Sequence, residues 1–150
     1  MACSTGAVLY YICLTLNPKP MENQEKINSL LMEHAVWQQR LAAYKMDLKK
    51  FYDDLGSYLL RKEPRDIPSD AEHFQNQFIL QREVLDILRH DMKQYENLLE
   101  SNFEKPGKNT ISELESRRDS LASRLDDFVK IFNELCREYG AFKSEGMVAL

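Results

Sequence analysis

Apolar residues recur at alternating intervals of three and four along most of this 150-residue chain. That spacing is typical of helices that each bury one continuous seam, formed by positions a and d of a seven-residue repeat. The first series holds for five heptads and has one polar member, His34. It predicts a helix from about residue 22 to residue 61. Its seam residues are Ile27, Leu30, His34, Trp37, Leu41, Tyr44, Leu48, Phe51, Leu55 and Tyr58.

Two further series follow with the same spacing. They predict helices over about residues 70–103 and 111–143, and Arg118 is the charged residue within the third seam. The second seam consists of Ala71, Phe74, Phe78, Gln81, Leu85, Leu88, Met92, Tyr95, Leu99 and Asn102. The third consists of Leu114, Arg118, Leu121, Leu125, Phe128, Phe132, Leu135, Tyr139 and Phe142.

Proline residues separate the three helices. Pro64 and Pro68 interrupt the first because proline lacks an amide donor and its ring clashes with the preceding turn, and Pro106-Gly107 is a strong turn pair. Both connections are short, so consecutive helices must lie antiparallel. We therefore expect an all-α fold, an antiparallel up-down-up three-helix coiled-coil bundle that resembles a spectrin repeat in shape alone.

Two sequences match the capping box, in which a Ser or Thr side chain and a Glu three residues later satisfy each other's free backbone amides. Ser69 with Glu72 predicts the start of the second helix, and Thr110 with Glu113 predicts the start of the third.

The first twenty residues differ from the rest of the chain. Gly6 to Leu16 is an almost unbroken apolar run, too short to span a bilayer and without the basic residues of a secretory signal. We expect residues 1–20 to be a non-native or disordered extension, residues 21–144 to form the bundle, and residues 145–150 to be a frayed tail. The alternatives for residues 6–16 are a peripheral membrane segment and a docked N-terminal strand or helix.

Composition narrows the possible partners. The formal net charge is -4 and both signs are interspersed, so we expect no nucleic-acid partner. The three cysteines, Cys3, Cys13 and Cys136, are scattered, which argues against a disulfide framework and is compatible with the cytoplasm.

Three polar seam residues are predicted to share one layer. With the turns centred near residues 65 and 106, His34, Tyr95 and Arg118 fall within about one helical turn of each other, with Glu33, Glu96 and Glu115 near the arginine. One interpretation is a small site in which His34 acts as an acid or base and Arg118 binds an anion. The favoured interpretation is a polar layer that sets the register of the helices.

Motifs of catalysis or cofactor binding are missing from the sequence. His73 and His90 fall at outward positions away from His34, and no Glu-x-x-His motif of a di-iron bundle occurs. We therefore expect no enzyme activity, no cofactor, no metal site and no small-molecule substrate.

The second helix carries more apolar residues than its seam uses. Ile79, Leu80 and Ile87 form a candidate partner face, with Leu80 and Ile87 at position c, which normally faces water. Val84, at position g, is expected to belong to the contacts between helices. The other interpretation is that these are scattered surface residues.

Glu72 to Glu83, together with Leu88 to Asp91, resembles a family of small uncharacterised bacterial coiled-coil proteins. Glu33-His34, Trp37 and the segment from Phe128 to Leu135 are similar to that family too. The resemblance covers about residues 21–143 and implies a cytoplasmic helical protein without an assigned activity.

Taken together, these features favour a non-enzymatic protein that acts through protein–protein contact or self-association. Two alternatives stay open. One is a ligand- or metal-binding bundle that uses the layer of His34, Tyr95 and Arg118, and the other is peripheral membrane association through residues 6–16.

Overall fold

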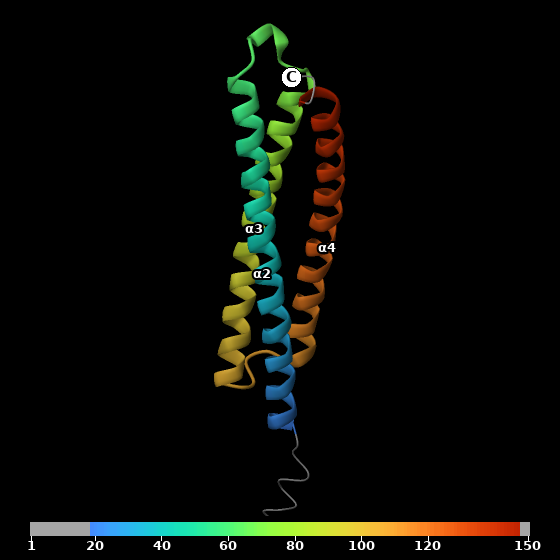
Figure 1. The fold of residues 1–150 in the computed structure, drawn as a ribbon. Helices are drawn as coiled ribbons and strands as arrows, with labels where there is room; N and C mark the ends of the chain where they lie inside the picture. Colours follow the sequence, from blue (N-terminus) through green and yellow to red (C-terminus); the bar gives the residue numbers. More distant parts are fainter. Residues whose placement is uncertain (1–18, 148–150) are drawn as a thin grey trace, which may run out of the picture.

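The computed structural model describes residues 19–147, and within this range it confirms the predicted all-α three-helix bundle. The long helices are α2 (Lys19–Leu60), α3 (Asp70–Glu104) and α4 (Ile111–Phe142). They run up, down and up beside one another, and α3 contacts both α2 and α4 (Figure 1). The expected extension before residue 19 lies outside the described residues. The chain beyond α4 continues as a π-helical turn, η2 (Lys143–Met147).

The seam is buried along nearly its whole length, and its two ends differ in chemistry. Near the first turn the core is aromatic: the ring centroids of Phe74 and Phe142 lie 4.9 Å apart, as do those of Phe78 and Tyr139. Near the second turn the buried residues include His34 and Asn102. Two of the three buried polar residues therefore lie toward the end where α3 turns into α4 (Figure 1), and the third, Gln81, lies beside the aromatic part of the core.

The start of α3 contradicts the predicted capping box at Ser69. This residue has helical dihedral angles (φ -57°, ψ -28°), and its side chain makes no capping hydrogen bond. A side-chain cap requires an extended residue, because only then does the hydroxyl reach the free amides of the first turn. The chain instead enters α3 from the 3₁₀ turn η1 (Pro64–Asp66), and the Ala71 amide donates to the Pro68 carbonyl at 3.1 Å.

The start of α4 confirms the other capping box. Thr110 is extended, its hydroxyl accepts from the Glu113 amide at 3.2 Å, and its own amide donates to the Glu113 carboxylate at 3.1 Å. Buried Asn102 closes the turn from the other side, since its side-chain carbonyl accepts the Asn109 amide at 3.0 Å. Gly107 adopts φ +112°, a conformation that other residues rarely reach.

No helix in the described part of the chain is long and apolar enough to cross a membrane.

Candidate functional site

His34 is a buried polar side chain without a hydrogen-bond partner, and the amide oxygen of Gln81 and the hydroxyl of Tyr139 also lack one in the described core. His34 is 1% exposed, and neither ring nitrogen has a hydrogen-bond partner. Its ring lies edge-on to Trp37 and Tyr95, with centroid distances of 6.5 Å and 5.9 Å. Its Nε2 atom is 3.9 Å from Oε2 of Glu96, too long for a hydrogen bond but close enough for a charged imidazole to feel the carboxylate.

Glu96 is engaged by other side chains. Its Oε2 atom accepts hydrogen bonds from Gln38 at 2.9 Å and from Lys93 at 2.8 Å, and these bonds lower the pKa of the carboxyl group. The pKa of His34 is also lowered, because burial disfavours the charged ring more than Glu96 favours it. The pair is therefore a neutral imidazole beside an ionised carboxylate near neutral pH.

Tyr95 closes the other side of the His34 ring. Its hydroxyl donates to the backbone carbonyl of Leu114 at 3.2 Å and so ties α3 to the first turn of α4. Burial raises the pKa of this phenol to about 12, with a further contribution from the negative charge of Glu33. The hydroxyl is consequently a permanent donor at physiological pH.

Arg118 extends to the edge of the bundle rather than into the layer. Its guanidinium binds the Glu33 carboxylate through two hydrogen bonds of 2.9 Å and 2.8 Å and also donates to Asp119 at 2.8 Å. The side chain is 39% exposed, and Glu33 raises its pKa. The structure thus brings His34 and Tyr95 into contact, while the positive charge of Arg118 acts against the raised pKa of Tyr95.

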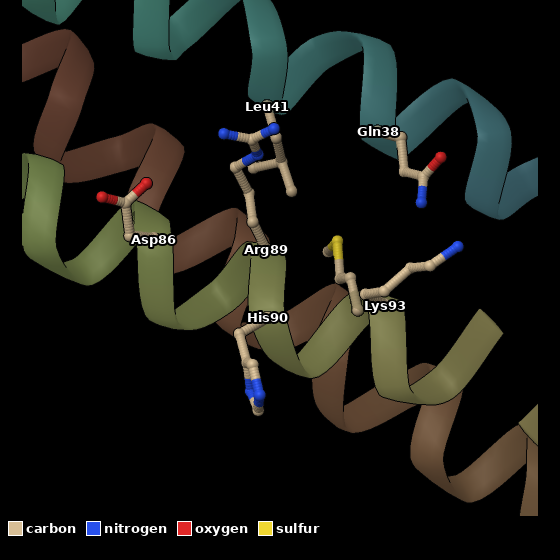
Figure 2. A pocket seen from close by; sticks show the side chains of 7 residues that line it. Gln38, Leu41, Asp86, Arg89, His90 and Lys93 are labelled. Atoms are coloured by element: carbon tan, nitrogen blue, oxygen red, sulfur yellow. The ribbon is translucent and has the colours of Figure 1, made fainter. Parts of the chain in front are cut away.

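A shallow groove of about 520 Å³ opens between α2 and α3 beside this layer (Figure 2). Arg89 and Lys93 extend from α3 toward the α2 side, whereas His90 points away from them (Figure 2). The groove was not anticipated from the sequence. The residues that line it are Gln38, Leu41, Asp86, Arg89, His90, Met92 and Lys93.

The polar contacts along this groove could have been predicted from heptad positions in the sequence. Gln38 and Glu96 both occupy position e, and antiparallel neighbours place such positions opposite each other at the seam border. The ion pair of Lys45 with Asp86, at 2.8 Å, continues the same border.

The three histidines lie apart in the structure. His73 is exposed and touches the ring of Phe74, and His90 is exposed beside Asp91. Within residues 19–147 there is no cluster of three or more His, Cys, Asp or Glu side chains arranged to hold a metal ion. Cys136 is half-buried, and burial raises the pKa of its thiol.

The predicted partner face is partly open to solvent. Leu80 is 48% exposed and Ile87 is 58% exposed, whereas Ile79 is half-buried and lines a small groove against α2. Val84, which was expected to belong to the contacts between helices, is 40% exposed and therefore partly open to solvent.

Ile131 of α4 extends this face. Asp91 of α3 and Arg124 of α4 form an ion pair at 2.8 Å, which shows how the two antiparallel helices are aligned. Val84 lies seven residues before Asp91, and Ile131 lies seven residues after Arg124, so the antiparallel helices place them opposite each other. Ile131 is 49% exposed. Leu80, Val84, Ile87 and Ile131 are called the α3 patch below.

Comparison with protein-family models, with curated proteins and with solved structures finds no match to this chain. The resemblance to small bacterial coiled-coil proteins therefore stays a prediction.

Proposed function

We propose that this protein is a non-enzymatic interaction protein that acts through protein–protein contact, with the α3 patch as its contact surface and a second copy of the chain as the partner. The observation that carries this proposal is the exposure of four large apolar side chains on neighbouring turns of α3 and α4. Exposed apolar side chains that gather on one face favour association, because contact removes them from water. The cytoplasm of a bacterium is the proposed location, as the resemblance implies.

The order of residues along α3 supports a second copy as the partner. A two-fold contact requires a surface that complements itself. When two α3 helices meet antiparallel with the axis between residues 83 and 84, Leu80 of each copy faces Ile87 of the other. Glu83 and the ion pair of Asp91 with Arg124 stand on the same side of α3 and supply a border of both charges.

The L80E/I87E double variant tests this function. Both side chains are exposed, so the fold should persist and the effect should fall on association. We expect the mass from light scattering to fall below that of the parent chain, because the contact through the α3 patch is lost. Leu60→Glu is the matched control, because Leu60 is 90% exposed and lies outside the α3 patch. An unchanged oligomeric state in the double variant, or an equal loss in the control, would reject the α3 patch as the interface.

A second candidate function uses the layer around His34. The two ring nitrogens without partners favour it, since a small polar ligand that reached them would satisfy both. His34→Leu separates the two interpretations. Loss of a species bound in native mass spectrometry supports a ligand site, and an unliganded, more stable protein supports a role in register.

A further inference from the structure

The outward side of α2 carries no charged residue over a long stretch. Between residues 28 and 46, every residue at heptad positions b, c and f is uncharged, and all of them are exposed. This stretch covers about 27 Å at 1.5 Å per residue. Its residues, called the α2 stripe below, are Asn28, Ser29, Met32, Ala35, Val36, Gln39, Ala42, Ala43 and Met46.

The other two helices differ from α2 in this respect. The same outward positions of α3 include Glu83, Asp86 and Lys93, and those of α4 include Asp126 and Lys130. A helix face that only meets water normally carries charged or strongly polar side chains. The α2 stripe instead exposes Met32 by 66%, Val36 by 57% and Met46 by 73%, and it is a second apolar surface, separate from the α3 patch.

The residues of the α2 stripe are arranged almost symmetrically about Gln39. Met32 and Met46 stand seven residues to either side, and Ala35 and Ala43 stand four residues to either side. Val36 and Ala42 are three residues away in the two directions. Asn28 and Ser29 have no counterpart in the stripe, but from Met32 it runs through alanine and valine, and from Met46 through alanine alone, to the central amide.

We propose that the α2 stripe is a seam for a second copy of this chain, which pairs antiparallel about a two-fold axis at Gln39. Such a contact is self-complementary, as a two-fold interface must be. Small residues beside the axis let the two helix backbones approach closely, since the interaxial distance depends on the side chains at the contact. The flexible methionines fill the space at the two ends.

Charge also favours a second copy over an unrelated partner. Two copies of a surface with no charge meet without placing like charges opposite each other along the stripe. The amide of Gln39 has both donors and an acceptor, so two of them can bond across the axis. Arg40 and Asp47 border the stripe, as charged residues border the apolar centre of an interface.

Gln39→Glu and Gln39→Lys test this proposal. Each places like charges together at the axis, and both substitutions keep an exposed residue with good helix propensity. Sedimentation velocity over a concentration series should show dimer dissociation constants raised at least tenfold for each variant alone. An equimolar mixture of the two should associate as strongly as the parent chain, because a carboxylate on one copy then faces an ammonium group on the other across the axis.

The control is Gln94→Glu, which makes the same chemical change at an exposed position of α3 and should leave association through the α2 stripe unchanged. The series is run in the full chain and in the L80E/I87E background. Association that survives this background but is lost with Gln39→Lys identifies the α2 stripe, whereas the converse identifies the α3 patch.

Three outcomes would overturn the proposal. The first is a parent chain that stays monomeric throughout the concentration series. If that monomer binds vesicles of neutral lipid, the stripe contacts a membrane and not a second copy. The second is equal dimerisation of the parent, Gln39→Glu and Gln39→Lys. The third is a mixture of the two variants that fails to recover, because the charges would then not meet at a two-fold axis.

Discussion

At the scale of single residues, the buried imidazole of His34 lies against the rings of Trp37 and Tyr95, and neither of its nitrogens has a hydrogen-bond partner. A buried polar group without a partner costs about 1–3 kcal/mol. Leucine keeps most of the apolar contacts and removes that cost. We expect His34→Leu to raise the free energy of unfolding by about 1–2 kcal/mol in urea titrations.

The control for this experiment is His73→Leu, an exposed site where the same change should alter stability little. A destabilised His34→Leu variant that keeps its fold would show that the ring nitrogens have partners in solution.

The lowered pKa of His34 predicts a second effect, on the pH dependence of stability. Burial lowers this pKa from its ordinary value of 6.5, so the unfolded chain takes up the proton first as the pH falls. The folded state therefore loses stability from about pH 6.5 down to the pKa of the folded protein. The charged groups that act on the His34 ring are Glu96, Lys93 and Glu100. The lowered pKa of Glu96 affects stability only below its ordinary value of 4.5, so it does not overlap with the effect of His34.

Urea midpoints measured at pH 8 and pH 5 check this dependence. The parent protein should lose more stability across the interval than His34→Leu does. Equal losses in the two proteins would show that His34 is not the titrating group.

At the scale of the helices, α3 and α4 begin differently, although both carry the same capping sequence pattern. Thr110 makes its cap and Ser69 does not. We expect Thr110→Ala to lower the free energy of unfolding by about 1 kcal/mol and Ser69→Ala to change it by a few tenths at most. Thermal or urea denaturation of the two variants measures the contrast. Similar losses at the two sites would mean that Ser69 also caps its helix in solution.

At the scale of the whole molecule, the contacts among aromatic rings are unevenly distributed. Rings gather near the first turn, including Phe78 with Tyr139, although Gln81 is also buried there, whereas the other end holds His34 and Asn102. Local opening requires less free energy where fewer apolar contacts are broken. We therefore expect hydrogen exchange to be slowest in α3 around residues 74–85 and faster around residues 95–102. Uniform or reversed protection would contradict this gradient.

Helix number, order and approximate ends follow from the sequence for a physical reason. The three-and-four spacing is a local property of each segment, and proline breaks or kinks a helix interior because of its own ring and missing amide donor. Position in the heptad likewise correctly marks Leu80 and Ile87 as exposed.

Apart from Ser69 at the start of α3, the residues for which the sequence was insufficient lie where side chains from two helices meet. Val84 at the border of the seam is open to solvent, and Arg118 binds Glu33 rather than Glu96 or Glu115. Periodicity specifies which side of a helix faces inward, but the reach and direction of a border side chain depend on the distance between helices.

The sequence by itself determined three helices, their antiparallel order, their seams and the absence of charge along the α2 stripe, because each depends on the spacing of residues within one segment. The tertiary structure alone decided that His34 lies beside Tyr95 without a hydrogen bond, that Ser69 enters its helix without a cap, and that Val84 joins the α3 patch. These features depend on the axial shift and separation of neighbouring helices, which are set by the packing of all three seams together.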